Sequence, residues 1–249
     1  VMRRMRRRRA DIGTHDSAQR FTSLGVDVFF GDAQFTGPAE VAVNGQGLRF
    51  KRAVIATGTR PAVPSIPGLA DIPYLTNETL FWLTERPSRL VIIGGGPVGC
   101  EMAQAFARFG SEVTLLDLST QLLPREDRDA AEVVANQLRR DGVRTELGLR
   151  LQLVKPSNDG FQVQFERDGV QSEVIGDQLL VATGRTPNVE NLNLEAAGVA
   201  YSQQGVVVDD RLRTSAARVF AAGDVCSSFR FTHAADAMAR IVIQNALFF

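Results

Sequence analysis

The sequence predicts an α/β protein made of two similar three-layer units, one of which is interrupted by the other. Apolar, β-branched runs at 89–93, 112–116 and 177–182 alternate with amphipathic helical patterns, which is typical of parallel sheets covered by helices. A glycine-rich segment, 94–99, joins the first run to a helix. Segments 53–61 and 180–187 have similar sequences. In each, a buried strand ends at Thr-Gly and leads into a loop that contains proline.

The composition favours a globular protein and excludes several partner classes. The chain has 249 residues, enough for two small domains, with 44% hydrophobic and 22% charged residues. Its 28 Lys and Arg residues balance 28 Asp and Glu residues, so no overall field favours nucleic acid or a membrane. No apolar run approaches the ~20 residues of a membrane span. The two cysteines form no short-range pair, so we expect a cytoplasmic protein.

The ends of the chain are unusual. Six of the seven residues from Arg3 to Arg9 are arginine, which we interpret as a solvated helix face; an arm that binds nucleic acid or an anionic surface is the alternative. The chain begins within a helical pattern and ends on an apolar one. We therefore expect a piece of a larger protein.

The elements expected before the glycine-rich segment follow from periodicity and turn residues. They are a helix over 1–22, a strand at 26–30, a turn at 31–33, a hairpin over 39–50 turning at Asn44-Gly45, a buried strand at 52–56 and a proline-rich linker over 60–73.

The later elements follow from the same signals. One helix ends at Gly110 and has its apolar face at Val98, Met102, Ala105, Phe106 and Phe109; a second spans 127–140 with its face at Ala130, Val134, Gln137 and Leu138. Strands are expected at 144–147, 149–154, 160–166, 171–175, 177–182, 205–208 and 218–221. A last helix starts at Thr232, which is expected to cap it.

The segment Gly94, Gly95, Gly96, Pro97, Val98, Gly99 matches the G-x-G-x-x-G pattern of a dinucleotide site. The first glycine permits the tight turn, the second lets backbone approach a pyrophosphate, and the third lets helix pack on strand. Asp117 ends the next strand, 21 residues past Gly96, where a carboxylate accepts hydrogen bonds from a ribose. This predicts a Rossmann-like unit.

The residues around Asp117 indicate which nicotinamide cofactor, NAD or NADP, the site would bind. A carboxylate there disfavours a 2′-phosphate, and Leu118, Ser119 and Thr120 supply no arginine to hold one. We therefore expect NAD, with NADP as the second possibility.

Five segments together resemble the FAD-dependent pyridine nucleotide–disulfide oxidoreductases: 53–61, 94–101, 182–188, 219–225 and 231–247. Val219 to Val225 is similar to the second flavin motif of that family. Phe231 to Ala234 resembles the mercuric reductase and dihydrolipoamide dehydrogenase branch, and the segment Leu123 to Asp127 resembles the mercuric-reductase-like members.

The resemblance implies two Rossmann-like, FAD- and NAD(P)-binding domains, the FAD one incomplete and discontinuous. Residues 1–79 and 191–249 would belong to the FAD domain and 80–190 to the NAD(P) domain. Gly184 would join the NAD(P) site, and Glu101 would be the catalytic residue, paired beside the flavin with a lysine outside this chain. The residues expected at FAD are Ala33, Thr57, Gly58, Gly223, Asp224, Phe231, Thr232 and His233.

Local chemistry agrees with two of these FAD assignments. Asp224 follows an apolar strand and a glycine, so its carboxylate can accept hydrogen bonds from the ribityl hydroxyls. The helix from Thr232 would direct its free N–H groups at the flavin. In His233 the backbone is expected to matter more than the imidazole.

One departure from the family is large. Its members pass electrons to a cysteine pair separated by four residues, which lies near the first flavin helix. That pair is absent here, as is the first flavin fingerprint. Cys100 stands early in a helix, which could lower its pKa, but we interpret Cys100 and Cys226 as structural. The C-terminal domain that forms the homodimer is absent too.

The function expected of the parent protein is hydride transfer from NAD(P)H through FAD to a disulfide, a metal ion or another small substrate. An NADH oxidase or quinone reductase is one alternative. A dinucleotide-binding module without catalysis is another. No resident metal is expected.

Overall fold

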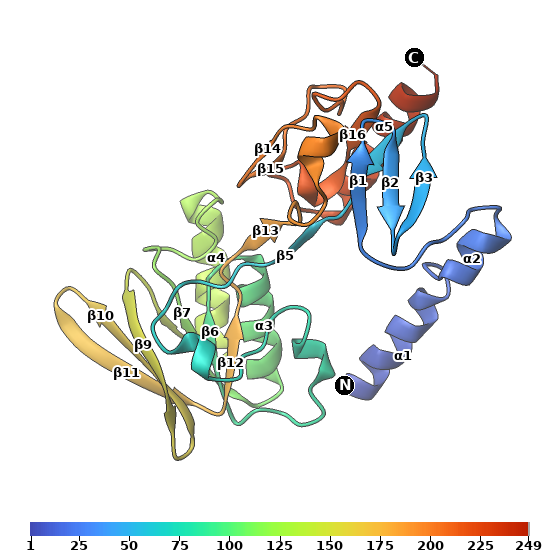
Figure 1. Ribbon diagram of the computed structural model, residues 1–249. Helices are drawn as coiled ribbons and strands as arrows, with labels where there is room; N and C mark the ends of the chain where they lie inside the picture. The colour runs from blue at the N-terminus through green and yellow to red at the C-terminus, as the bar shows by residue number, and fades with distance from the viewer. Residues whose placement is uncertain (249) are drawn as a thin grey trace. The chain divides into compact units, whose positions relative to one another are not determined.

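The computed structural model describes residues 1–248, and these form two compact units (Figure 1). The middle unit comprises Pro61–Gly184. The split unit combines Arg3–Arg60 with the chain from Arg185 onwards. The resemblance implied a middle domain over residues 80–190, whereas the observed unit starts earlier, at Pro61, and ends at Gly184.

A parallel sheet is the centre of the middle unit. Its strands follow the order β12 (Gln178–Val181), β6 (Arg89–Ile93), β7 (Glu112–Leu116) and β8 (Arg144–Glu146). Each predicted strand is present. The sheet is buried on both faces, since Leu90 and Ile92 join one core cluster while Val91 and Ile93 join another, which explains why its strands are continuously apolar.

Two further layers cover this sheet. Helices α3 (Pro97–Arg108) and α4 (Arg128–Arg140) contribute Phe106 and Leu138 to the cluster of Leu90 and Ile92. The antiparallel strands β9 (Arg150–Ser157), β10 (Gly160–Arg167) and β11 (Val170–Gly176) supply Phe161 and Val163 to the other cluster. The three-layer prediction is confirmed for this unit.

The expected linker over 60–73 is part of the middle unit. It contains a 3-10 helix, η1 (Leu69–Asp71), and Leu69 is buried with Ile72 in the cluster on the β9–β11 side. A second 3-10 helix, η2 (Leu80–Trp82), buries Leu80 in the opposite cluster. The prolines exclude a regular α-helix, as expected, but the apolar residues of this segment pack into the hydrophobic core of the middle unit.

The buried faces of the two helices differ from prediction. In α3 the buried residues are Gly99, Cys100, Ala103 and Phe106, whereas the predicted Val98 and Phe109 are exposed. In α4, Ala131 is buried in place of Ala130. The face of α3 is set by Gly99, because only a glycine allows the close approach to β6 described below.

In the split unit, β1 (Ala33–Gly37), β2 (Glu40–Val43) and β3 (Gln46–Arg49) form an antiparallel sheet. The predicted turn at Asn44-Gly45 is confirmed, with φ of 49° and 82°, as a two-residue hairpin requires. The first strand of this sheet was not predicted, since only Ala33 was assigned, to a turn, and residues 34–37 were given no element.

The rest of the split unit surrounds a parallel pair, β4 (Ala53–Ile55) and β16 (Val219–Ala221). Helix α5 (Thr232–Leu247) packs Val242 against Phe220. Short elements complete the unit: β14 (Tyr201–Ser202), β15 (Gly205–Val206), and the 3-10 helices η3 (Leu194–Ala197) and η4 (Gly223–Val225).

Three expectations for the split unit are wrong. The predicted first helix is two helices, α1 (Met2–Gly13) and α2 (Ala18–Ser23), because Ser17 caps the second by accepting from Arg20 N–H at 3.2 Å. Segment 26–30 is not a strand, since no strand within residues 1–248 pairs with it. Val54 is 48% exposed although its strand was expected to be buried.

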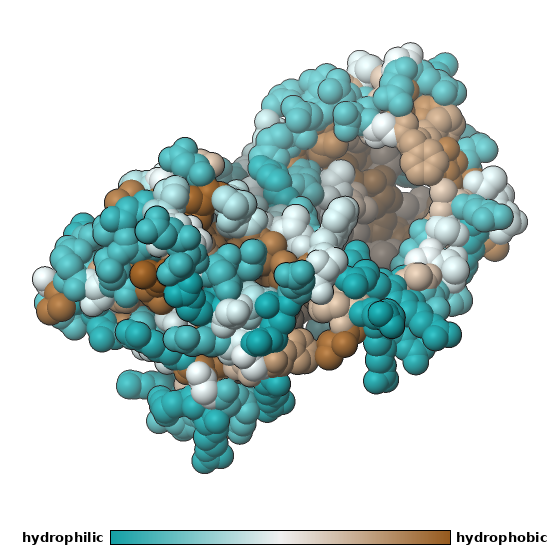
Figure 2. All heavy atoms as spheres, turned by 90° about the horizontal axis from the view of Figure 1, so that it is seen from below, coloured by the Kyte–Doolittle hydropathy of each residue, from teal (hydrophilic) through white to brown (hydrophobic). Residues whose placement is uncertain are grey.

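Apolar side chains are exposed on the split unit. Figure 2 shows brown apolar patches among hydrophilic residues on one face of the molecule. The large exposed apolar residues of this unit include Val28, Phe30, Phe229, Ile243 and Phe248. Within the part of the chain that the structure describes, no helix is long and apolar enough to cross a membrane.

Helix α3 approaches β6 most closely at Gly99. A Cβ at this position would lie 1.8 Å from the Gly94 carbonyl oxygen, whereas a Cβ at Gly96 would meet nothing within 4 Å. We therefore expect Gly99→Ala to lower the free energy of unfolding by about 1–3 kcal/mol or more, because backbone must move to admit the methyl group. Gly96→Ala is the matched control and should change it by less than about 0.5 kcal/mol. Urea unfolding followed by circular dichroism measures both, and equal stabilities would contradict this packing.

Candidate cofactor sites

The glycine turn after β6 has the geometry that a dinucleotide needs. Gly94 has a φ of 116°, and a Cβ there would lie 2.4 Å from the Ala182 carbonyl oxygen. Gly96 faces open space, so a ligand can approach its backbone. The three glycines of the motif thus differ in what they allow: a tight turn, access for a ligand, and helix packing.

The N-terminus of α3 can hold an anion. Its N-cap is Gly96, which has no side chain to accept a hydrogen bond from the first-turn N–H groups, and Pro97 occupies the first helical position. Amide N–H groups at such an end attract phosphate, aided by the helix dipole. Val98, 38% exposed, lies beside this end.

Asp117 comes directly after β7 and faces the glycine turn. Its carboxylate accepts hydrogen bonds from the N–H of Gly95, through Oδ2, and from Ser119 N–H at 2.6 Å, through Oδ1. It therefore ties the glycine turn to the following loop. Each oxygen keeps acceptor capacity, so the carboxylate can also take a hydrogen bond from a ribose hydroxyl.

The other two residues expected at this site lie at its margins. Glu101 is exposed on α3, one turn beyond the N-terminus. Gly184 ends the middle unit and has a φ of 137°. Before it, the Thr183 hydroxyl donates to Ala62 O at 2.9 Å.

In the split unit, Asp224 is held by a small polar network. Its Oδ2 accepts from the Thr59 hydroxyl at 2.9 Å and lies 3.7 Å from Arg185 Nε. Arg185 also donates to Thr59, through Nε to the hydroxyl at 2.5 Å and through Nη2 to the carbonyl at 2.8 Å. Within residues 1–248, Oδ1 of Asp224 has no hydrogen bond, which leaves it for a ligand hydroxyl.

The segments around Thr57 and Asn188 are bound together. Thr57 donates its hydroxyl to Asn188 O at 2.7 Å, and Asn188 Nδ2 donates to Thr57 O at 2.8 Å. Asn188 N–H donates to Gly58 O at 3.0 Å. The adjoining strands β5 (Thr59–Pro61) and β13 (Arg185–Pro187) pair with each other, so the two predicted strand exits lie side by side.

An ion pair reinforces these segments. Arg60 donates to both carboxylate oxygens of Glu190, at 2.7 and 2.8 Å, and to Asn188 Oδ1 at 3.1 Å. Hydrogen bonding to this guanidinium lowers the pKa of Glu190 to about 2. Both side chains are about half exposed, so the pair adds little to stability.

The start of α5 differs from the sequence prediction. Phe231, not Thr232, is the N-cap, because its carbonyl accepts from Ala235 N–H at 3.0 Å; Thr232 is the first helical residue. No side chain caps this end, so its N–H groups remain available, as at α3. The rings of Phe231 and His233 stack, with centroids 5.4 Å apart. Gly223 has a φ of 79° in η4, and Ala33 begins β1.

Sequence reasoning missed Thr59 and Arg185 as partners of Asp224. They lie 165 and 39 positions from it, so no local pattern connects the three. The one signal in the sequence is the similarity between segments 53–61 and 180–187, because Thr59 and Arg185 each follow the Thr-Gly of their segment.

Neither cysteine has the features of a redox thiol. Cys100 is 5% exposed, and burial, followed by the charges of Asp117 and Glu101, raises its pKa to about 11. The helix start therefore does not lower the pKa of Cys100, because desolvation outweighs the dipole. Burial likewise raises the pKa of Cys226 to about 11. Among the described residues, no group of three His, Cys, Asp or Glu side chains could hold a metal ion.

Comparison with known proteins agrees with this geometry. The pyridine nucleotide-disulphide oxidoreductase family matches residues 8–239. Mercuric reductase from Staphylococcus aureus is 39% identical over 224 residues, which are 90% of this chain and 41% of that protein. Dihydrolipoyl dehydrogenase from Thermus scotoductus is 36% identical over 225 residues, covering 89% of this chain and 49% of the relative.

A solved structure has the same fold. The HOCl-induced flavoprotein disulfide reductase RclA from Escherichia coli superposes with a TM-score of 0.86 at 35% identity, over 97% of this chain and 56% of that one. This chain thus spans about half the length of the relatives it matches. With glycine turn, acidic strand end and second flavin motif all in place, the chain belongs to the pyridine nucleotide–disulfide oxidoreductase family.

Proposed function

We propose that this chain is the nucleotide-binding part of an FAD-dependent NAD(P)H oxidoreductase of the mercuric reductase or dihydrolipoamide dehydrogenase type. The observation that carries the proposal is the open Gly96 at an uncapped helix start beside Asp117. The bound cofactors would supply hydride transfer and electron storage. The chain's own residues would bind, orient and shield them.

The middle unit would hold the nicotinamide dinucleotide. Gly94, Gly95 and Gly96 would bring backbone to the pyrophosphate, the N-terminus of α3 would stabilise its charge, and Asp117 would accept from the ribose. Pro97, Val98 and Gly99 complete the turn, with Gly184 at its margin. We propose Glu101 as the residue that acts where the nicotinamide docks.

The split unit would supply part of the FAD site. Asp224 would accept from the ribityl chain through the oxygen that the Thr59 network leaves free. The N–H groups at the start of α5 would favour negative charge on the flavin. Thr57, Gly58 and Ala33 would contribute backbone, as would Gly223 and the segment Phe231, Thr232 and His233.

The natural acceptor would be a disulfide, a metal ion or another small substrate reached through a cysteine pair. Cys100 and Cys226 are 126 positions apart, and burial suppresses the thiolate of each. They do not replace such a pair. Homodimerisation and a cytoplasmic location belong to the same proposal.

The first test is cofactor binding. Titration of the chain with NADH, followed by calorimetry, should give saturable binding. Gly96→Val should abolish it, because the side chain would fill the space through which the pyrophosphate approaches. The fold should survive, since a Cβ at Gly96 has nothing within 4 Å; circular dichroism is the control. Unchanged affinity in a folded variant would refute the proposed site.

The second test is thiol reactivity. At about pH 8, a thiol with a pKa of about 11 is ionised on the order of 10²-fold less than an ordinary thiol. Both cysteines should label correspondingly slowly with iodoacetamide in the folded chain, and fast in urea. Since folding favours the neutral thiols, the free energy of unfolding should also fall as the pH rises from about 8.5 to about 11. Fast labelling at about pH 8 would contradict a structural role.

The third test is turnover. With FAD and NADH supplied, this chain alone should reduce neither disulfides nor Hg(II), because it offers no near-neighbour cysteine pair to receive electrons. Flavin retention, and bleaching of flavin absorbance by NADH, can be measured separately and would distinguish a cofactor-binding part from a module without redox function. Robust NADH-dependent disulfide reduction by the chain would overturn the role assigned to its cysteines.

A further inference from the structure

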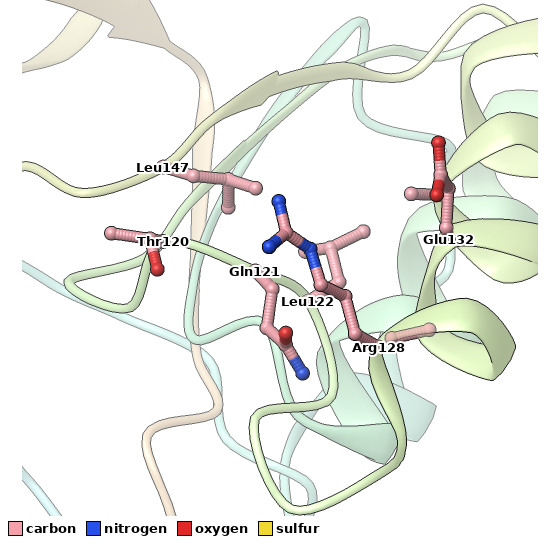
Figure 3. A pocket seen from close by; sticks show the side chains of 8 residues that line it. Thr120, Gln121, Leu122, Arg128, Glu132 and Leu147 are labelled. Atoms are coloured by element: carbon pink, nitrogen blue, oxygen red, sulfur yellow. The ribbon is translucent and has the colours of Figure 1, made fainter.

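The middle unit has a cavity of about 180 Å³ beside the loop that follows Asp117 (Figure 3). Thr120 and Gln121 of that loop line it, and α4 presents to it both a cation, Arg128, and an acid, Glu132. Because the loop continues directly from Asp117, this cavity belongs with the dinucleotide site that we propose.

A larger cavity, of about 300 Å³, lies in the split unit, at the amino ends of β4 and β16. Among the residues that line it, Arg52 immediately precedes β4, Ala217 lies two residues before β16, and Phe220 belongs to β16. Asp224, by contrast, follows the carboxyl end of β16. The cavity and the proposed flavin residue thus lie at opposite ends of this parallel pair.

Two arginines give the cavity of the split unit its positive charge. Arg52 is exposed just before β4, and Arg213 is partly buried on the loop that leads to β16. Arg52 donates to the neighbouring Lys51 carbonyl at 3.0 Å. Within residues 1–248, neither guanidinium lies at ion-pair distance from a carboxylate. Like charges that line one cavity repel each other, so an anion between them is favoured.

One acid, Asp209, also lines this cavity, but the loop itself engages its carboxylate. Its Oδ1 accepts from the N–H groups of Arg211 and Arg213, both at 2.9 Å. Hydrogen bonding from Arg213 N–H is the main cause that lowers the pKa of Asp209, so this side chain stays ionised at neutral pH. The adjoining segments 51–52 and 209–218 together contain five Lys or Arg residues and two Asp residues. Positive charge therefore exceeds negative charge here even with Asp209 ionised.

The loop that carries Arg213 is held in place by its own contacts. Leu212 has a φ of 60°, which is uncommon for a residue other than glycine, and its side chain is buried beside Phe220. Asp209 N–H donates to Arg213 O at 3.0 Å, and Ala221 N–H donates to Leu212 O at 3.2 Å. A guanidinium on such a fixed backbone loses less conformational freedom when it binds a ligand.

We propose that this cavity of the split unit binds a small phosphate-bearing anion between Arg52 and Arg213. A phosphate group has several strongly accepting oxygens, so it can receive hydrogen bonds from two guanidinium groups at once. A carboxylate has two oxygens and a single charge, which one guanidinium satisfies. The volume of the cavity also admits a small organic body attached to the phosphate. Such a ligand would join the start of β4 to the loop before β16, independently of any cofactor.

Calorimetric titration of the whole chain with inorganic phosphate and with glycerol phosphate tests this site. Arg52→Ala and Arg213→Ala should each weaken binding by about tenfold or more, equivalent to about 1.4 kcal/mol. Arg213→Lys should fall between, because it keeps the charge but loses the paired hydrogen bonds. Arg211→Ala is the matched control, since this exposed arginine of the same loop does not line the cavity and its N–H to Asp209 is retained; affinity should stay within about twofold.

The two probes distinguish the source of the phosphate. Equal affinities assign the site to the free ion, and tighter binding of glycerol phosphate assigns it to an organic phosphate; both results support the site, provided that affinity falls as sodium chloride is raised. The proposal is overturned if neither probe gives saturable binding, or if affinity is unchanged in Arg52→Ala and Arg213→Ala variants that circular dichroism shows to be folded. Malonate that binds as tightly as phosphate would overturn the preference for phosphate.

Discussion

The close contact between Gly99 and the Gly94 carbonyl oxygen sets the arrangement of the whole middle unit. Because no side chain fits between them, α3 lies against β6 and buries Cys100, Ala103 and Phe106. The same contact directs the start of α3 at the carboxyl edge of the sheet, where its amide groups face outward. The packing of α3, and the phosphate binding that we propose at its start, thus depend on one backbone approach.

The carboxyl edge of this sheet is built from opposing charges. The carboxylate of Asp117 holds the Gly95 amide and the next loop in place, so it shapes the turn as well as offering an acceptor. The uncapped start of α3 contributes partial positive charge, and the first turn of α4 carries Asp129 beside Arg128.

In the split unit, the residues that we propose at the flavin lie close to the chain connections between the units. Thr59 and Arg185 belong to the paired strands β5 and β13, and both contact Asp224, which lies in η4 after β16. The residues that orient the acid are therefore the ones at which the chain passes from one unit to the next. Thr59 is buried, with 9% of its surface exposed, and its hydroxyl accepts from Arg185 and donates to Asp224.

The sequence by itself determined the parallel strands, the glycine turn and the position of Asp117 at the end of β7, because each depends on spacing along a short stretch of chain. It misjudged segments 26–30 and 60–73, since pairing and burial depend on distant partners. Only the tertiary structure decided which face of α3 is buried and that Thr59 and Arg185 meet Asp224. Such contacts join residues far apart in sequence, and no local periodicity records them.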